Sequence, residues 1–188
     1  ATDTVLPAYI FTEQSTDLSF RFELLPATTK PANETCSTTE VLLPSTPTVA
    51  SVVDAVPDVS SGCAPATGDL VYKFDLLQTS NIDLYATSVD GDGLPVISLR
   101  DVNCSLPADE ISCNVAANAH IFRHSLPVGT YFVSVAATAP TDVVLTLETS
   151  APTPAPDGDD CSGTPPTLAH NKTVDVLFGG YQDDIDMG

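Results

Sequence analysis

The chain has little positive charge and no tryptophan. Its 188 residues include 6 lysines and arginines against 25 aspartates and glutamates, a formal net charge of −19. An electrostatic field of that sign repels phosphate backbones and anionic bilayers, so we expect no nucleic-acid partner. Carbohydrate sites generally use exposed aromatic platforms, and a chain with no Trp and 5 Tyr is poorly supplied with them.

Two further absences limit the function. No window approaches the ~18 uninterrupted apolar residues that a membrane-spanning helix needs, and the first residues lack a signal-peptide pattern. We therefore expect no membrane insertion of this segment, and a mature protein or a piece of a longer one. The sequence also lacks GxSxG, HExxH, a Cys–His signature and a phosphate-binding glycine loop, and its acidic residues sit in loops. The chain is therefore predicted not to be an enzyme.

The sequence does contain short alternating segments separated by Gly, Pro, Asp and Asn. Alternation of apolar with polar residues is typical of strands that bury one face. LPVGTY predicts a strand, a tight turn and a second strand, with Gly129 supplying the positive φ that the turn needs. The segments predict an all-β, antiparallel β-sandwich of jelly-roll type, with strands at 39–43, 48–53, 69–77, 82–89, 95–102, 119–126, 129–137 and 142–149.

A long internal repeat organises the chain. Cys36 and Cys161 lie 125 positions apart, and aligning residues 16–63 with 141–188 at that offset keeps the apolar alternation in step. A shared period of two indicates that the same strands bury the same face. Identical residues recur at Thr16, Asp17, Glu23, Thr28, Pro31, Cys36, Ser37, Thr39, Leu43, Thr48, Val49 and Asp58.

The repeat predicts three parts joined by Pro-rich, semi-rigid linkers. Residues 1–30 would be the C-terminal part of one repeat, residues 31–150 a complete β-sandwich, and residues 151–188 a linker with the N-terminal part of the next. Because Cys161 corresponds to Cys36, we expect its partner beyond residue 188. The alternative is that Cys161 is a reactive or intermolecular thiol.

The other four cysteines are predicted to form structural disulfides. The spacing favours Cys36 with Cys63, and Cys104 with Cys113 across the short loop CSLPADEISC. Zinc is the alternative, but zinc sites usually show close CxxC or HxxxH pairs. Cysteines in an acidic, lysine-poor chain favour an oxidising compartment, so we expect a secreted or cell-surface protein.

Several polar motifs have both a binding and a plain structural interpretation. DGDG at 90–93 resembles the start of a calcium loop, but it lacks the later ligands and is better explained as a polar turn. Calcium, the one cofactor considered, has stronger candidates in the acidic residues Asp157, Asp159, Asp160, Asp183, Asp184 and Asp186, although solvated acidic loops are the favoured explanation of these residues too. His120 and His124 share one strand face, too far apart for a common metal without help.

Three sequons fit the pattern for N-glycosylation, at Asn33, Asn103 and Asn171. In a bacterial product they would usually be idle. In a eukaryotic product they would support a secreted, glycosylated surface.

The order of features in residues 31–150 resembles the bacterial pre-peptidase C-terminal domain, especially divergent tandem copies in large secreted proteins of myxobacteria. The matching segments are NETC and DGDDC, GDLVYKFDL, VISLRDVNC with ISC, and LPVGTYFVSVAA running into TDVVLTLET. The resemblance implies a β-sandwich that accompanies secreted peptidases or recurs in surface proteins. It implies a role in adhesion, solubility or substrate contact, without chemistry.

Together these features predict a non-catalytic, extracellular structural repeat protein that forms a surface array or filament. Its expected partners are neighbouring copies of itself, in tandem or by strand complementation. The alternatives are a secreted module that binds polysaccharide, protein or calcium, and an accessory domain of a secreted peptidase.

Overall fold

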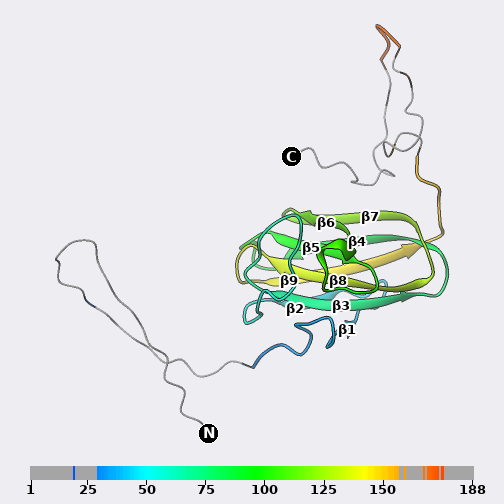
Figure 1. Cartoon of the computed structure of the whole chain (residues 1–188). Coiled ribbons are helices and arrows are strands. Elements are labelled where there is room, and N and C mark those ends of the chain that lie inside the picture. Colours follow the sequence, from blue (N-terminus) through cyan, green and yellow to red (C-terminus); the bar gives the residue numbers. More distant parts are fainter. Residues whose placement is uncertain are drawn as a thin grey trace.

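The computed structural model describes residues 19, 29–156, 159, 167, 169–173 and 175. Their strands form two sheets packed face to face (Figure 1). One sheet has five strands in the order β1-β3-β8-β5-β6, and the other has four in the order β2-β9-β4-β7. The strands are β1 Glu40–Val41, β2 Thr48–Ser51, β3 Asp69–Leu76, β4 Ser80–Ser88, β5 Pro95–Arg100, β6 Glu110–Val115, β7 Asn118–Leu126, β8 Gly129–Ala137 and β9 Asp142–Ser150, with a short 3₁₀ helix at Pro107–Asp109.

The expected all-β sandwich is confirmed, with one departure from antiparallel pairing. The two-residue strand β1 runs parallel to β3, with Glu40 opposite Tyr72 and Val41 opposite Lys73. The remaining strand pairs in the described residues are antiparallel. Consecutive strands lie in different sheets except β5 and β6, so the chain crosses between the layers at nearly every connection.

One of these crossings corrects the prediction for LPVGTY. The two residues between β7 and β8 do not close a hairpin, because β7 belongs to the four-stranded sheet and β8 to the five-stranded sheet. The positive φ lies at Ser125 (47°), and Gly129 is not among the glycines with positive φ. The chain turns the corner at the end of β7, before the proline.

The alternation seen in the sequence places one face of each main strand in the core. In β9, for example, Val143, Leu145 and Leu147 are fully buried between the sheets, while the residues between them are partly exposed. Burying side chains of this size stabilises by about 1.5–3 kcal/mol each. The same pattern in β3, β4 and β8 completes the core.

All eight predicted strands are present, and β6 is a ninth that the sequence did not predict. Its sequence, EISCNV, alternates polar and apolar residues, and all six residues are partly buried. It is a strand because its backbone pairs with β5, with Ser98 opposite Cys113. The nine strands lie within 31–150, whereas most of the two predicted flanking fragments lies outside the described residues. The repeat therefore stays a prediction.

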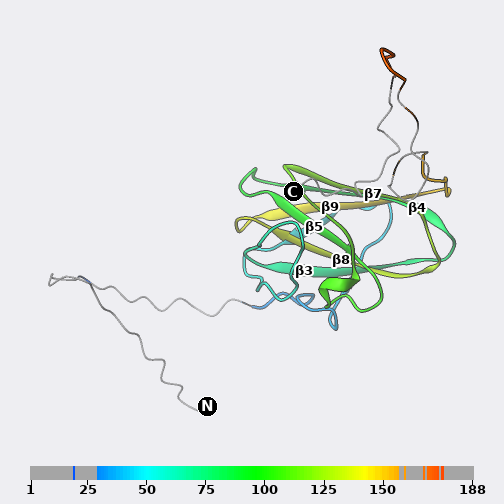
Figure 2. The same ribbon diagram turned by 45° about the horizontal axis from the view of Figure 1, so that its top comes forward.

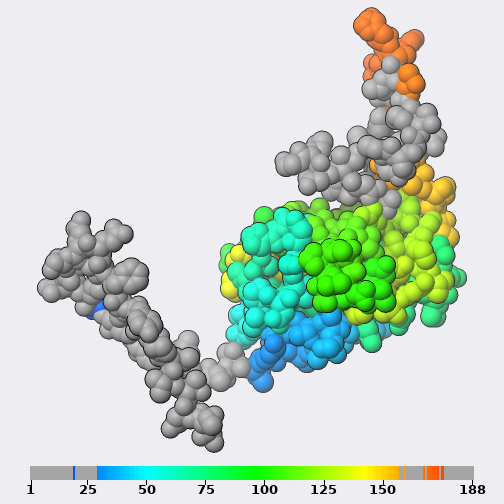
Figure 3. All heavy atoms as spheres, in the orientation of Figure 1, coloured from blue at the N-terminus to red at the C-terminus, as the bar shows by residue number. Residues whose placement is uncertain are grey.

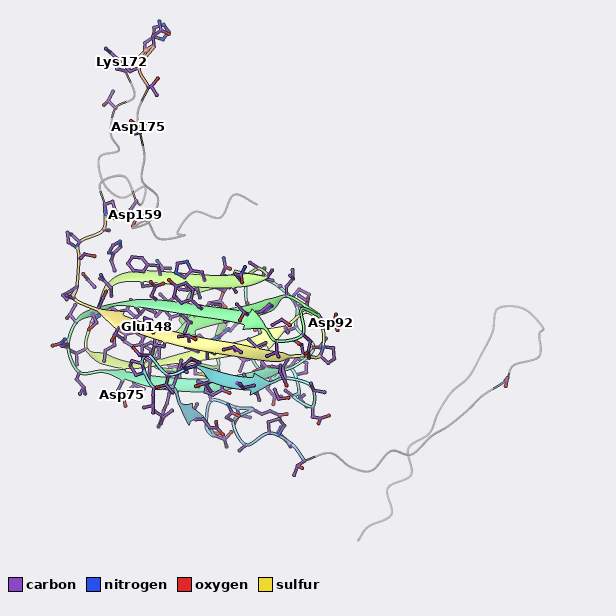
Figure 4. The ribbon with its side chains drawn as sticks, turned by 180° about the vertical axis from the view of Figure 1, so that it is seen from behind. Asp75, Asp92, Glu148, Asp159, Lys172 and Asp175 are labelled. Atoms are coloured by element: carbon purple, nitrogen blue, oxygen red, sulfur yellow. A yellow bond between two sulfur atoms is a disulfide. The ribbon has the colours of Figure 1, made fainter. Side chains whose placement is uncertain are left out.

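The chain reaches and leaves the sandwich at opposite ends (Figures 1 and 2). Residues 29–36 approach where β3 begins, since Asn33 O accepts a hydrogen bond from Val71 N (2.6 Å). We call this the incoming end. The chain leaves after Ser150, which pairs with Asn81 at the start of β4, and we call this the outgoing end. In Figure 4, Asp75 and Glu148 lie toward the outgoing end and Asp92 lies at the other.

No helix among the described residues is long and apolar enough to cross a membrane.

Candidate functional site

Three loops cover the outer face of the five-stranded sheet, the face turned away from the core. They are residues 31–38, 54–68 and 101–109, and Figure 3 shows them side by side in blue, cyan and green. Because of this cover, Val71, Ser98 and Arg100 are buried although they point outward from the sheet. We call the three loops the cap.

Two disulfides fasten the cap, and they correct the predicted pairing. Cys36 is bonded to Cys104, and Cys63 to Cys113, with Cα–Cα distances of 5.8 and 5.9 Å. The four cysteines are in disulfides as expected, but the pairing of Cys36 with Cys63 and of Cys104 with Cys113 is wrong. The physical reason is that β6 pairs with β5. This pairing points Cys113 to the outer face beneath the 54–68 loop, while Cys104 lies beneath the 31–38 loop.

A fully buried arginine holds the cap from below. Arg100 donates from Nε to Ser98 Oγ (3.0 Å), and from Nη1 to the carbonyl oxygens of Cys104 (2.8 Å) and Leu106 (3.2 Å). Its Nη2 donates to the carbonyl of Ser60 and lies 3.3 Å from Glu110 Oε2. Burial lowers the pKa of Arg100, and the Glu110 carboxylate acts against that effect. One guanidinium thus joins two of the three loops to β5.

Glu110 completes this cluster. Its Oε1 accepts a hydrogen bond from Gly62 N (3.0 Å), and its Oε2 accepts one from Ser98 Oγ (2.6 Å). A side chain added at Gly62 would place its Cβ 2.5 Å from Glu110 Oε1. The hydrogen-bonding atoms of the cluster are therefore occupied by protein groups, an arrangement suited to fixing loops in place.

A second buried carboxylate lies where the cap meets the incoming end. Asp69 Oδ1 accepts hydrogen bonds from Asp58 N (2.6 Å) and Val59 N (2.9 Å), while its Oδ2 has no donor among the described residues. Burial is the main reason that the pKa of Asp69 is raised to about 6, since the two N–H groups act in the opposite direction. Burial therefore destabilises the charged form of this carboxylate.

A cavity of about 230 Å³ remains between the 54–68 loop and the sheet. Its walls are mostly small or apolar, including Pro57, Val59 and Pro65, and Ser98 and Ser134 contribute hydroxyl groups. Because Ser98 already bonds Arg100 and Glu110, Ser134 is left as the polar group of the floor.

The incoming segment is held to the sandwich by polar side chains. The buried Asn33 donates from Nδ2 to Val71 O (3.4 Å), and the buried Glu34 accepts a hydrogen bond from Val56 N (3.0 Å). Lys30 forms an ion pair with Glu34 and lies 3.6 Å from Asp58 Oδ2. The path of the chain into the sandwich is therefore fixed from Lys30 onward.

The outgoing linker is fixed in a similar way by Thr153. Its backbone N donates to Asn81 Oδ1 (3.0 Å), and its carbonyl accepts from Ser125 Oγ (2.8 Å). Its hydroxyl accepts from Asn81 Nδ2 (2.9 Å) and shares a hydrogen bond with His124 Nδ1 (2.8 Å). We call this set of contacts the linker clasp. The sequence had shown only a Pro-rich tether here, because neither Asn81 nor Ser125 is near Thr153 in the chain.

The outer face of the four-stranded sheet carries a row of aromatic side chains. Tyr85 and His120 stack with ring centroids 4.5 Å apart and planes 8° apart, and His120 Nε2 contacts Asp83. Farther along β7, Phe122 and His124 meet edge to face at 4.7 Å. Burial raises the pKa of Tyr85, with further contributions from Asp83 and Glu148, so its hydroxyl stays protonated. This row is an exposed aromatic surface that the composition alone did not indicate.

The predicted calcium residues fall mostly outside the described part of the chain. This applies to Asp157, Asp160, Asp183, Asp184 and Asp186, and to Cys161. Asp159 is described and is buried, with its N donating to Pro156 O (3.2 Å). Within the described residues, no group of three or more His, Cys, Asp or Glu side chains is arranged to hold a metal ion.

The remaining motifs have local explanations. DGDG links β4 to β5 as a turn, with positive φ at Gly91 and Gly93 and a hydrogen bond from Gly91 N to Ser88 Oγ (3.1 Å). His120 and His124 have different neighbours, Asp83 and Thr153. Of the three sequons, Asn33 is buried, while Asn103 and Asn171 are exposed.

Some solved structures are similar to this chain. The chain is similar to the pre-peptidase C-terminal domain of a collagenase from Bacillus anthracis, at 15% identity and a TM-score of 0.43, over 58% of this chain and 94% of that one. It is also similar to a GH26-CBM35 beta-(1,4)-mannanase from Podospora anserina, at 18% identity and a TM-score of 0.30, over 62% of this chain and 31% of that one. No family model and no curated protein matches the sequence. Function is therefore argued from this chain's own residues.

Proposed function

We propose that residues 31–150 form a non-catalytic structural module of a secreted protein, and that such modules follow one another end to end in a surface array or filament. The module would work as a spacer, which receives the chain at one end and releases it at the other. Its partners are neighbouring copies of itself.

The observation that supports this function is that the chain enters and leaves the sandwich at opposite ends (Figures 1 and 2). The chain is held at the incoming end by Asn33, Glu34 and Lys30, and at the outgoing end by the linker clasp. A module held at opposite ends extends an array, whereas adjacent termini would make each module a side branch.

The cap supports use outside the cell. Disulfides persist in oxidising compartments, and here one joins the 31–38 loop to the 101–109 loop while the other joins the 54–68 loop to β6. The net charge of −19 adds mutual repulsion, which keeps exposed modules soluble and prevents lateral clumping.

Electron microscopy of the native protein, with sizing chromatography, tests this function. The expected images show beads in single file along a thin strand. A compact, monodisperse particle without such a strand would contradict the array.

The aromatic row on β4 and β7 favours a second candidate, a binding module for polysaccharide or protein. Tyr85 is 42% exposed, and aromatic rings beside carboxylates such as Asp83 suit contacts with sugar rings and hydroxyl groups. Calorimetry with a glycan panel, with and without calcium, tests it. A heat of binding that is lost in the variant Tyr85→Ala would support this candidate. If no ligand gives a heat of binding, the structural role is favoured.

A further inference from the structure

Both ends of the sandwich carry exposed apolar side chains. At the outgoing end, Leu77 is 91% and Val128 62% exposed. They adjoin each other, because the last pair of the β3–β8 ladder joins Leu76 to Gly129. We call them the outgoing patch. At the incoming end, Val53, Val56, Val89 and Leu94 are 44–53% exposed, and we call these the incoming patch.

The linker brings the next repeat close to the outgoing patch. The clasp holds Thr153, and the sequence repeat places the start of the next copy near residue 157. Only Pro154, Ala155 and Pro156 lie between, and three extended residues span about 9 Å at ~3.1 Å each. A module tethered that closely must lie against the end from which its tether leaves.

The repeat alignment also provides matching apolar residues in the next copy. At the offset of 125, Val53 corresponds to Phe178 and Val56 to Tyr181. The part of the incoming patch that these two positions form is thus predicted to be apolar in the following repeat too, with larger side chains. Large exposed apolar patches commonly mark interaction sites.

We infer that the outgoing patch of each module packs against the incoming patch of the next module in the same chain. This inference rests on the proposed function, which it deepens by naming the contact that stiffens the array. Figure 4 places Asp75 toward the outgoing end and Asp92 at the incoming end, so each end carries a carboxylate as well as its apolar side chains.

A designed tandem protein tests the contact. The strands of the described residues, the two disulfides among them and their core lie within residues 29–156, so this segment serves as the single module. It is compared with a tandem in which a second copy of residues 32–156 follows directly. We expect the tandem to unfold at a higher urea midpoint than the single module.

Lysines at the patch provide matched variants. Leu77→Lys with Val128→Lys in the first copy is expected to return the tandem to the midpoint of the single module. The same pair in the second copy, whose outgoing end is free, is expected to leave the higher urea midpoint of the tandem unchanged. In a single module, the pair is expected to have no effect on the midpoint. Equal effects in either copy, or a tandem with no upward shift, would overturn the inference.

Scattering and sizing separate this inference from the proposed function. An extended tandem without a shifted midpoint would overturn the contact and leave the array standing, whereas two modules lying side by side would overturn the array itself. A third outcome is that single modules associate as their concentration rises and that the lysine variant does not. This result would show that the outgoing patch joins separate chains, and it would overturn the inferred contact between successive modules of one chain.

Discussion

Arg100 shows how burial at a single residue depends on the rest of the chain. It lies in the alternating segment PVISLR, in which the period of two correctly places Ile97 and Leu99 in the core. The same pattern assigns Arg100 to the outer face and therefore to solvent. The cap covers that face, and it is built from residues far away in the sequence, so no local pattern could have predicted the cluster with Glu110.

Replacing this arginine tests the cluster. Arg100→Met is expected to destabilise by about 3–5 kcal/mol, because it leaves Glu110 buried without its cation and three carbonyl groups without their donor. Lys73→Met, which removes a partly exposed cation from the same sheet face, is the control. Urea unfolding measures both, and equal small losses would contradict a structural role for Arg100.

Asp69 gives a prediction about pH. Its pKa is raised from 3.8 to about 6, so the native state binds this proton more tightly than the unfolded chain does. The resulting stabilisation is complete below pH 3.8 and is lost as the pH rises through about 6. It amounts to roughly 3 kcal/mol at most, since one pKa unit corresponds to about 1.4 kcal/mol.

Asp69→Asn removes that titration and keeps an oxygen for the N–H groups of Asp58 and Val59. The difference in unfolding free energy between the two proteins, measured from pH 4 to pH 7.5, is expected to move in favour of the variant as the pH rises. A difference that stays constant over this range would show that Asp69 is not perturbed.

The strands show how far a local pattern reaches at the scale of elements. Alternation and turn residues were enough to predict eight strands, because each buries one face and leaves the other free. β6 was missed, although EISCNV alternates polar and apolar residues as well, and this error also gave the wrong disulfides. Treating CSLPADEISC as a loop made Cys104 and Cys113 natural partners, whereas the strand points Cys113 to the cap.

Tryptic digestion without reduction distinguishes the two pairings. The peptide that ends at Lys73 contains Cys36 and Cys63, and residues 101–123 contain Cys104 and Cys113. The structure predicts that these peptides stay linked until a reductant is added. The pairing inferred from spacing would give two separate peptides, each with an internal bridge, and mass spectrometry tells these apart.

Removing either disulfide tests what the cap contributes. Cys36→Ala with Cys104→Ala, or Cys63→Ala with Cys113→Ala, opens a loop of 68 or 50 residues. In the chain-entropy model, closing loops of this length stabilises by about 4 kcal/mol. Thermal unfolding of each variant is expected to show a clear fall in Tm, and an unchanged Tm would mean that the cap adds nothing.

The linker clasp is an element that only tertiary contacts define. Asn81→Ala removes the acceptor of Thr153 N and Ser125 N together with the donor to the Thr153 hydroxyl. Loss of these bonds is expected to destabilise by ~1–3 kcal/mol and to remove protection of the Thr153 amide in hydrogen exchange. Asn118→Ala, at an exposed asparagine on the same sheet, should do neither, and a still protected Thr153 amide in the first variant would rule out the clasp.

At the scale of the whole molecule, the predicted repeat could be found from the sequence, whereas the positions of the two ends of the module could not. The offset of 125 residues could be read from the sequence because identical residues and apolar positions recur along it. The opposite placement of the two ends could not, since it follows from the order of strands in the two sheets. The predicted repeat and the opposite ends of the module together predict an extended array.

The most direct test is small-angle scattering from proteins of one, two and three modules in tandem. The longest strands have nine residues, which span about 30 Å at ~3.3 Å per residue. The account predicts that every added module lengthens the particle by at least ~30 Å in a steady series. A maximum dimension that levels off as modules are added, with the particle growing thicker instead, would contradict it.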